Sequence, residues 1–197
     1  MKRLAIVLVI AAAGCSLGGG GLKETFYVLS GPEAPMPAAS ADSPVIYVGP
    51  VAVPDAVDRA PMVLMNSANN VDLSEEHRWA EPLKTAIPRI VGEHLMRLLD
   101  TTRVMTSRVG TSVDTDYRIA LEVQRFDSSL RDGATIDVLW TITGKRLPSG
   151  GRSGRSTVHE PATSATPEGV AAAHSRALAR VAADIAAAIR ELPAASK

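Results

Sequence analysis

The sequence is poor in the residues that supply covalent cross-links and aromatic pockets. It contains one cysteine, Cys15, and only 4% aromatic residues in 197 positions. A single thiol excludes an intrachain disulfide, so a packed core must stabilise the fold, and the chain is long enough for one domain of ordinary size. Because alanine is abundant where aromatic residues are scarce, we expect helices packed closely on a sheet.

An excess of charge of either sign is also lacking. The 21 basic and 21 acidic side chains balance, and loss of Lys2 and Arg3 with an N-terminal leader would leave 19 basic groups (21 minus 2) against 21 acidic ones. A nearly neutral surface argues against a nucleic-acid partner and against broad adsorption to anionic lipid.

Long hydrophobic runs are confined to the N-terminus. Lys2 and Arg3 precede an apolar run of ten residues, 4–13. This pattern is typical of a signal peptide, residues 1–14, that is cut before Cys15. No later segment approaches the roughly 18 uncharged apolar residues of a membrane-spanning helix, so we expect the mature protein to have none.

Cys15 stands directly after the small residues Ala12, Ala13 and Gly14, which resembles the lipobox of bacterial lipoproteins. There the cysteine thiolate accepts a diacylglycerol, and two or three acyl chains hold the protein at a membrane, each buried methylene contributing about 0.8 kcal/mol. We predict lipidation at Cys15 and a flexible tether over residues 15–22, which include four consecutive glycines. The alternative is a free or buried cysteine near an ordinary cleavage site.

Short apolar or alternating segments predict a series of β-strands. They lie at residues 23–30, 45–53, 62–65, 103–107, 117–124, 135–143 and 153–159. The segments 117–124 and 135–143 alternate strictly between apolar and polar side chains, which indicates adjacent antiparallel strands with one solvated face each. Residues 66–70 predict a polar turn.

Two segments have helical spacing. In residues 79–99 the apolar side chains of Leu83, Ile87 and Ile90 follow one stripe. Pro88 either kinks this helix or begins it, and we favour a kink. The second helix has Thr166 as its N-cap, Pro167 in its first turn and Pro193 just past its end.

The order of strands, helix, strands, helix predicts a single α/β domain of the α+β sandwich type. We expect two helices packed on a mostly antiparallel sheet, with the domain spanning residues 23–193 and a C-terminal tail at 194–197.

Three strings of residues, in this order, resemble the ABC-type transport auxiliary lipoprotein family. They are Val48-Gly49-Pro50-Val51-Ala52-Val53-Pro54, Asp58-Arg59-Ala60-Pro61-Met62-Val63 and His77-Arg78-Trp79-Ala80-Glu81-Pro82-Leu83. The likeness continues to the opening of the last helix at 175–179 and so covers nearly the whole mature chain. It implies a subunit that works beside an ATP-binding protein, a permease and a substrate-binding protein of the mammalian-cell-entry type, which carry lipid between two membranes.

The residues suggest no catalytic or metal-binding site. The nucleophile-elbow pattern Gly-x-Ser-x-Gly is absent, and no two histidines have the H-x-x-x-H spacing of a zinc site. We therefore expect no enzyme activity, no metal and no cofactor apart from the lipid on Cys15.

Two groups of side chains are candidates for contact with a partner. The first is Asp58, Arg59, Trp79 and Glu81, which could fix the loop and the helix entrance or form a docking surface. Met62 and Leu64 join this group because an apolar edge strand can recruit a strand of another chain.

The second group is Lys145, Arg146, Arg152 and Arg155, which flank one predicted hairpin turn. If these four residues only form the solvent-exposed tip of the hairpin, they need no function. The alternative is contact with phosphate head groups or with acidic residues of a partner.

The leading hypothesis is a non-enzymatic lipoprotein on the periplasmic face of the outer membrane that docks the substrate-binding protein. Ser16 supports the outer membrane, because the aspartate that retains lipoproteins at the inner membrane is absent there. A second hypothesis is a periplasmic carrier that holds an acyl chain between helix and sheet, and a third is a hydrolase. Binding of phospholipid and assembly into a homo-oligomer stay open.

Overall fold

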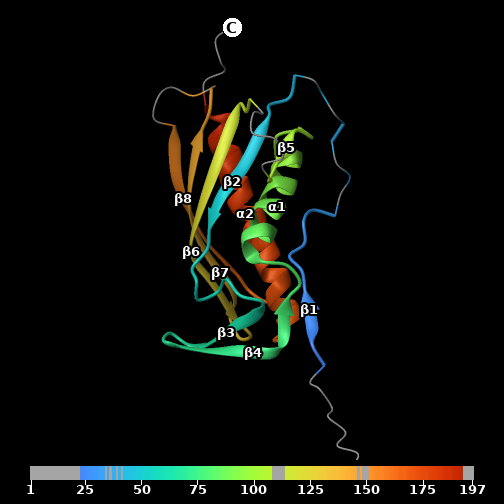
Figure 1. The fold of residues 1–197 in the computed structure, drawn as a ribbon, viewed down its shortest axis with the longest axis vertical. Coiled ribbons are helices and arrows are strands. Elements are labelled where there is room, and N and C mark those ends of the chain that lie inside the picture. Colours follow the sequence, from blue (N-terminus) through green and yellow to red (C-terminus); the bar gives the residue numbers. More distant parts are fainter. Residues whose placement is uncertain are drawn as a thin grey trace, which may run out of the picture.

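A computed structural model describes residues 23–192 of the chain, except residues 34, 36, 39, 41, 108–113, 146 and 148–150. These residues form one mixed sheet of eight strands and two helices (Figure 1). The strands are β1 (Thr25–Tyr27), β2 (Ile46–Ala52), β3 (Pro61–Ser67), β4 (Asn70–Trp79), β5 (Val104–Met105), β6 (Tyr117–Ser129), β7 (Gly133–Thr143) and β8 (Arg152–Glu160). The helices are α1 (Leu83–Leu98) and α2 (Pro167–Arg190). The predicted α+β class is confirmed.

Strand β6 organises the sheet. One of its edges pairs with β7 in an antiparallel ladder from Arg118↔Thr143 to Ser129↔Gly133, and β7 pairs with β8 in the same sense. The other edge pairs in parallel with β2 and, further along, with β3 at Leu64↔Ser128. Helix α1 lies between β2 and β6 in the chain and carries it back across the sheet, which allows these two strands to run parallel.

Both helices lie on one side of the sheet (Figure 1). The alternation in β6 and β7 places Ile119, Leu121, Ile136 and Val138 under them, and all four are buried. Helix α2 packs on β7 and β8, while α1 packs on β2 and on α2. The opposite face of β6, β7 and β8 is polar and faces solvent, as the period-two pattern predicts.

The first helix begins at Leu83, not at residue 79, because residues 70–79 form strand β4. The prediction of a turn over residues 66–70 was too long, since only residues 68 and 69 turn and the chain then pairs back along β3. Most of β4 is exposed, and its only apolar side chains before Trp79 are Val71 and Leu73, too few to reveal a ten-residue strand. Pro88 lies inside α1, so the helix does not begin there.

Strand β3 lies between β4 and β6, so the prediction that residues 62–65 form an edge strand was wrong. Met62 is fully buried and Leu64 is half-buried. Residues 1–22 and 193–197, which include the predicted signal peptide, Cys15, the tether and the tail, lie outside the described residues. Neither described helix has the length and apolar character that a membrane span requires.

Candidate docking site at the entrance of α1

The first group of candidate residues meets at the start of α1. Asp58 and Arg59, from the loop after β2, line a surface pocket of about 340 Å³ together with Trp79, Glu81 and Pro82, from the junction of β4 and α1. We call it the α1-entrance pocket. Two strings that are about twenty residues apart in the chain thus form one surface feature.

Asp58 and Arg59 each fix the loop, but they do so through different partners. Asp58 forms an ion pair with Lys84 in the first turn of α1, with 2.6 Å between Oδ2 and Nζ. The hydrogen bond with Asp58 raises the pKa of Lys84. Arg59 donates from Nη2 to the Asp55 carbonyl oxygen at 3.3 Å and remains exposed. Arg59 is therefore the cationic group that the pocket offers to a partner.

Glu81 is held by a cation from α1. Arg89 donates to Glu81, to Glu93 at 3.0 Å and to the Leu29 carbonyl oxygen at 3.3 Å. The hydrogen bond with Glu81 raises the pKa of Arg89. This network ties the segment after β1 to the helix entrance, so Glu81 has a structural task whether or not it meets a partner.

Trp79 forms the inner wall of the pocket. Only 6% of its surface is exposed, and its backbone N–H donates to the Ala60 carbonyl oxygen at 2.8 Å. Its indole ring contacts the rings of Phe126 and His174 edge-on, each at 6.0 Å between centroids. These contacts support a structural role for Trp79. With Trp79 and Met62 buried, Arg59 is the most accessible of the predicted docking residues.

A buried histidine on α2 completes the packing behind Trp79. His174 on α2 is fully buried, stacks on Phe126 at 3.8 Å and shares a 2.8 Å hydrogen bond between Nε2 and the Ser128 hydroxyl. Burial lowers the pKa of His174 to about 3. Its Nδ1 has no hydrogen-bond partner among the described residues. A serine beside a histidine is a hydrolase pairing, but neither side chain reaches the surface here.

The second group of candidates does not gather into one patch. Lys145 pairs with Asp114 at 2.8 Å, Arg152 pairs with Glu191 on the helix side of the sheet, and Arg155 pairs with Asp137 at 2.8 Å. The hydrogen bonds raise the pKa of Lys145 and of Arg155 and lower the pKa of Asp137. Arg146 lies outside the described residues. The three described cations are each neutralised by a nearby carboxylate.

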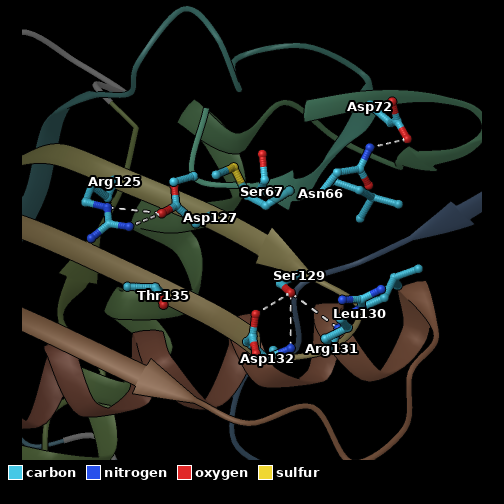
Figure 2. A pocket seen from close by; sticks show the side chains of 14 residues that line it. Asn66, Ser67, Asp72, Arg125, Asp127, Ser129, Leu130, Arg131, Asp132 and Thr135 are labelled. Atoms are coloured by element: carbon cyan, nitrogen blue, oxygen red, sulfur yellow. Dashed lines mark hydrogen bonds and ion pairs between the residues drawn. The ribbon is translucent and has the colours of Figure 1, made fainter. Parts of the chain in front are cut away.

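A larger cavity of about 740 Å³ opens between the β3–β4 hairpin and the β6–β7 turn. Figure 2 shows that its polar groups bond to one another, Arg125 with Asp127 and Asn66 with Asp72. Ser129 accepts from the Asp132 backbone N–H at 3.1 Å, which fixes the turn. A cavity whose charged side chains face each other in this way is a poor site for an acyl chain.

The fold of the domain is similar to that of proteins of known structure. The chain is similar to an uncharacterized protein with 16% sequence identity and a TM-score of 0.68 over 85% of this chain and 99% of that one. It is also similar to a protein from Xanthomonas campestris, with 22% identity and a TM-score of 0.62 over 82% of this chain and 92% of that one. At such identities the likeness concerns the fold alone. No curated protein matches the sequence.

The class of protein is defined by a family model that covers most of the chain. The family model described as "ABC-type transport auxiliary lipoprotein component" matches residues 27–186. The chain belongs to this family, and its membership implies association with an ABC-type transport system in the cell envelope.

Proposed function

We propose that the protein is a non-enzymatic subunit that docks the substrate-binding protein of an intermembrane lipid transport system. In this proposal the lipid on Cys15 fixes the subunit at the periplasmic face of the outer membrane. The partner, of the mammalian-cell-entry type, binds at the α1-entrance pocket. The subunit carries out no covalent chemistry. Its task is to hold the substrate-binding protein in place at the outer membrane.

One observation carries the docking part of the proposal. The Asp58-Arg59 and Trp79-to-Pro82 strings, which carried the family resemblance, converge on one surface pocket. The loop is braced by Asp58–Lys84 and the helix entrance by Glu81–Arg89, so Arg59 is presented from a rigid frame. Arginine beside a braced apolar wall is a frequent hot spot in protein interfaces.

The carrier hypothesis has less support. An acyl chain between helix and sheet would need a cavity there, but Ile136, Leu178 and Ile185 fill that layer and are fully buried. The α1-entrance pocket and the larger cavity both lie at the surface, and nine of the fourteen residues that line the larger cavity are charged or polar. Gentle purification with phospholipid bound in about equimolar amount would favour the carrier instead.

Copurification with the substrate-binding protein tests the docking. Arg59→Ala should abolish the copurification and leave the melting temperature unchanged, because the side chain is exposed. Arg97→Ala is the matched control, since Arg97 is an exposed arginine at the far end of α1. Full copurification by the Arg59→Ala protein would show that the pocket is not the docking site.

Membrane fractionation tests the placement. Ser16→Asp should move the lipidated protein from the outer to the inner membrane, while Ser16→Ala should leave it in place. An unchanged distribution of the Ser16→Asp protein would contradict the outer-membrane assignment. The neighbouring genes give an independent check, because the proposal expects an ATPase, a permease and a mammalian-cell-entry protein to be encoded beside this chain.

A further inference from the structure

Exposed apolar side chains collect at one end of the molecule. Five large apolar side chains are prominently exposed among the described residues, and four of them belong to two neighbouring segments. Phe26 and Val28, at β1 and just after it, are 58% and 56% exposed, and Val71 and Leu73, on β4, are 47% and 51% exposed. We call these four residues the apolar end.

The strands β1 and β4 are neighbours in the sheet, although the pairing joins β1 to residues 77–79 while Val71 and Leu73 lie toward the other end of β4. Strand β1 pairs in parallel with the last residues of β4, Phe26 opposite Arg78. Figure 1 shows the β3–β4 hairpin lying across the end of the molecule at which β1 begins. Val71 and Leu73 stand opposite Met65 and Val63 in the hairpin, so they extend an apolar face of two strands. The packed core does not use these side chains.

The apolar end is also where the described chain leads toward its lipid anchor. Thr25, the first residue of β1, lies ten positions after Cys15, with nine residues between them. A chain of that length spans at most about 33–36 Å when fully extended. Once Cys15 is acylated, β1 with Phe26 and Val28 is therefore the part of the apolar end that is tied closest to the lipid.

We infer that the apolar end rests on the membrane surface and that Phe26, Val28, Val71 and Leu73 insert among the head groups and upper acyl chains. Aromatic and branched apolar side chains are the ones that favour this boundary. The lipid anchor and the apolar end then act as two membrane contacts, which fix the orientation of the domain as well as its position. The inference rests on acylation of Cys15 and not on the docking partner.

The charges near the apolar end specify which lipid surface suits it. Glu24 and Arg78 neutralise each other at 2.9 Å, while Glu75 and Glu76 on β4 are exposed. Acidic side chains are repelled by the negative surface potential of anionic lipids and meet no net charge on zwitterionic ones. Contact should therefore depend on apolar insertion into a zwitterionic surface and weaken as anionic lipid is added.

Depth-dependent fluorescence quenching tests the inference on the full-length, lipidated protein, with the acylation first verified by mass spectrometry. The protein is placed in vesicles of phosphatidylethanolamine and phosphatidylcholine whose acyl chains carry bromine near the head groups. The native Trp79 and Trp140 are 6% and 7% exposed, so the unsubstituted protein supplies the baseline. Phe26→Trp and Leu73→Trp each add one reporter at the apolar end.

The matched control is Leu139→Trp. Leu139 is the fifth exposed large apolar side chain, 38% exposed on the outer face of β7. We expect the added emission of Phe26→Trp and Leu73→Trp to be largely lost to quenching and that of Leu139→Trp to be retained. Replacing part of the lipid by phosphatidylglycerol should reduce the quenching.

Two results would overturn the inference. One is added emission from Phe26→Trp and Leu73→Trp that survives the brominated lipid, and the other is equal quenching of all three variants, which would mean that the domain has no fixed orientation. If quenching is absent and Leu73→Asp abolishes copurification of the substrate-binding protein, the apolar end is a protein interface. Because the quenching measurement needs no partner protein, its result is independent of the docking proposal.

Discussion

Trp79 links the surface pocket to the core. It closes β4, bonds through its backbone to Ala60 and packs against Phe126 and His174. A residue in this position couples the conformation of the pocket to the stability of the whole domain, so loss of binding in a Trp79 variant must be separated from loss of folding.

Replacing Trp79 with alanine should lower the free energy of unfolding by about 3–5 kcal/mol, because it removes a buried indole and leaves a cavity between β4 and α2. Trp79→Phe should cost less, since a ring still meets Phe126. Urea denaturation followed by circular dichroism measures both. A Trp79→Ala protein that unfolds at the wild-type urea concentration would contradict the packing described.

His174 should make stability depend on pH. In the unfolded chain the imidazole binds a proton near its ordinary pKa of 6.5, whereas burial lowers the pKa of the folded state to about 3. The unfolded state thus binds more protons between these values, so stability falls as the pH falls through this range, by at most about 1.4 kcal/mol per pH unit.

Urea denaturation at a series of pH values checks this dependence. His174→Gln should flatten the slope of stability between pH 6.5 and 4, even if the variant is less stable at every pH. His159→Gln is the control, because it removes an exposed imidazole instead of the buried one. An unchanged slope in His174→Gln would mean that other groups cause the acid sensitivity.

At the scale of elements, α2 is the element whose start and buried face are most clearly encoded by neighbouring residues. The Thr166 side chain accepts from the Gly169 backbone N–H at 3.1 Å, and Pro167 occupies the first turn. Along the helix, Leu178, Val181 and Ile185 are fully buried, as their spacing predicts. A cap, a proline and one apolar stripe together define this helix without help from distant residues.

Thr166→Ala should lower the free energy of unfolding by about 1 kcal/mol, because it leaves an N–H at the start of α2 without its acceptor. Thr166→Ser keeps the oxygen and should preserve most of the stability. Thermal unfolding of the three proteins gives the comparison. Equal melting temperatures for the alanine and serine variants would show that the cap does not stabilise the helix.

The β7–β8 ladder depends on a glycine opposite a tryptophan. Gly154 pairs with Trp140, and a Cβ at position 154 would overlap the indole ring. That ring donates from Nε1 to Ser156, which in turn donates to Asp184 on α2 at 2.6 Å. The small residue lets the tryptophan lie flat and reach this chain of hydrogen bonds.

Gly154→Ala should therefore destabilise the fold by about 1–3 kcal/mol, the usual cost of overpacking. Ser153→Ala, at the neighbouring position on the outer face, should change stability by less than about 0.5 kcal/mol. Denaturation with urea compares the two. If both variants are as stable as the wild type, the indole has room to move that the structure does not indicate.

At the scale of the whole molecule, the main prediction from the sequence is that a lipid anchor holds the domain at a membrane. Cys15→Ala should yield a folded, soluble protein with an unchanged melting temperature, because the residue precedes the packed domain. The same protein should fail to support transport in cells that lack the wild-type chain. Full transport by the soluble form would show that anchoring is unnecessary.

The sequence by itself determined the features that depend on neighbouring residues. The alternating strands β6 and β7 and the capped helix α2 follow from patterns that extend over a few residues, and the predictions of a signal peptide and of lipidation at Cys15 rest on patterns of the same kind. The family strings could be read in the same way. Burial on one side of an element enforces a periodic pattern, and such a pattern is visible before any fold is known.

Only the tertiary structure decided the features that join distant parts of the chain. It turned residues 70–79 into a strand by pairing them with β3, gave Asp58 the partner Lys84, and separated Arg152 and Arg155 onto opposite faces of the sheet. The α1-entrance pocket and the burial of His174 arise in the same way. A contact between distant residues depends on how every intervening element packs, and no local pattern records that packing.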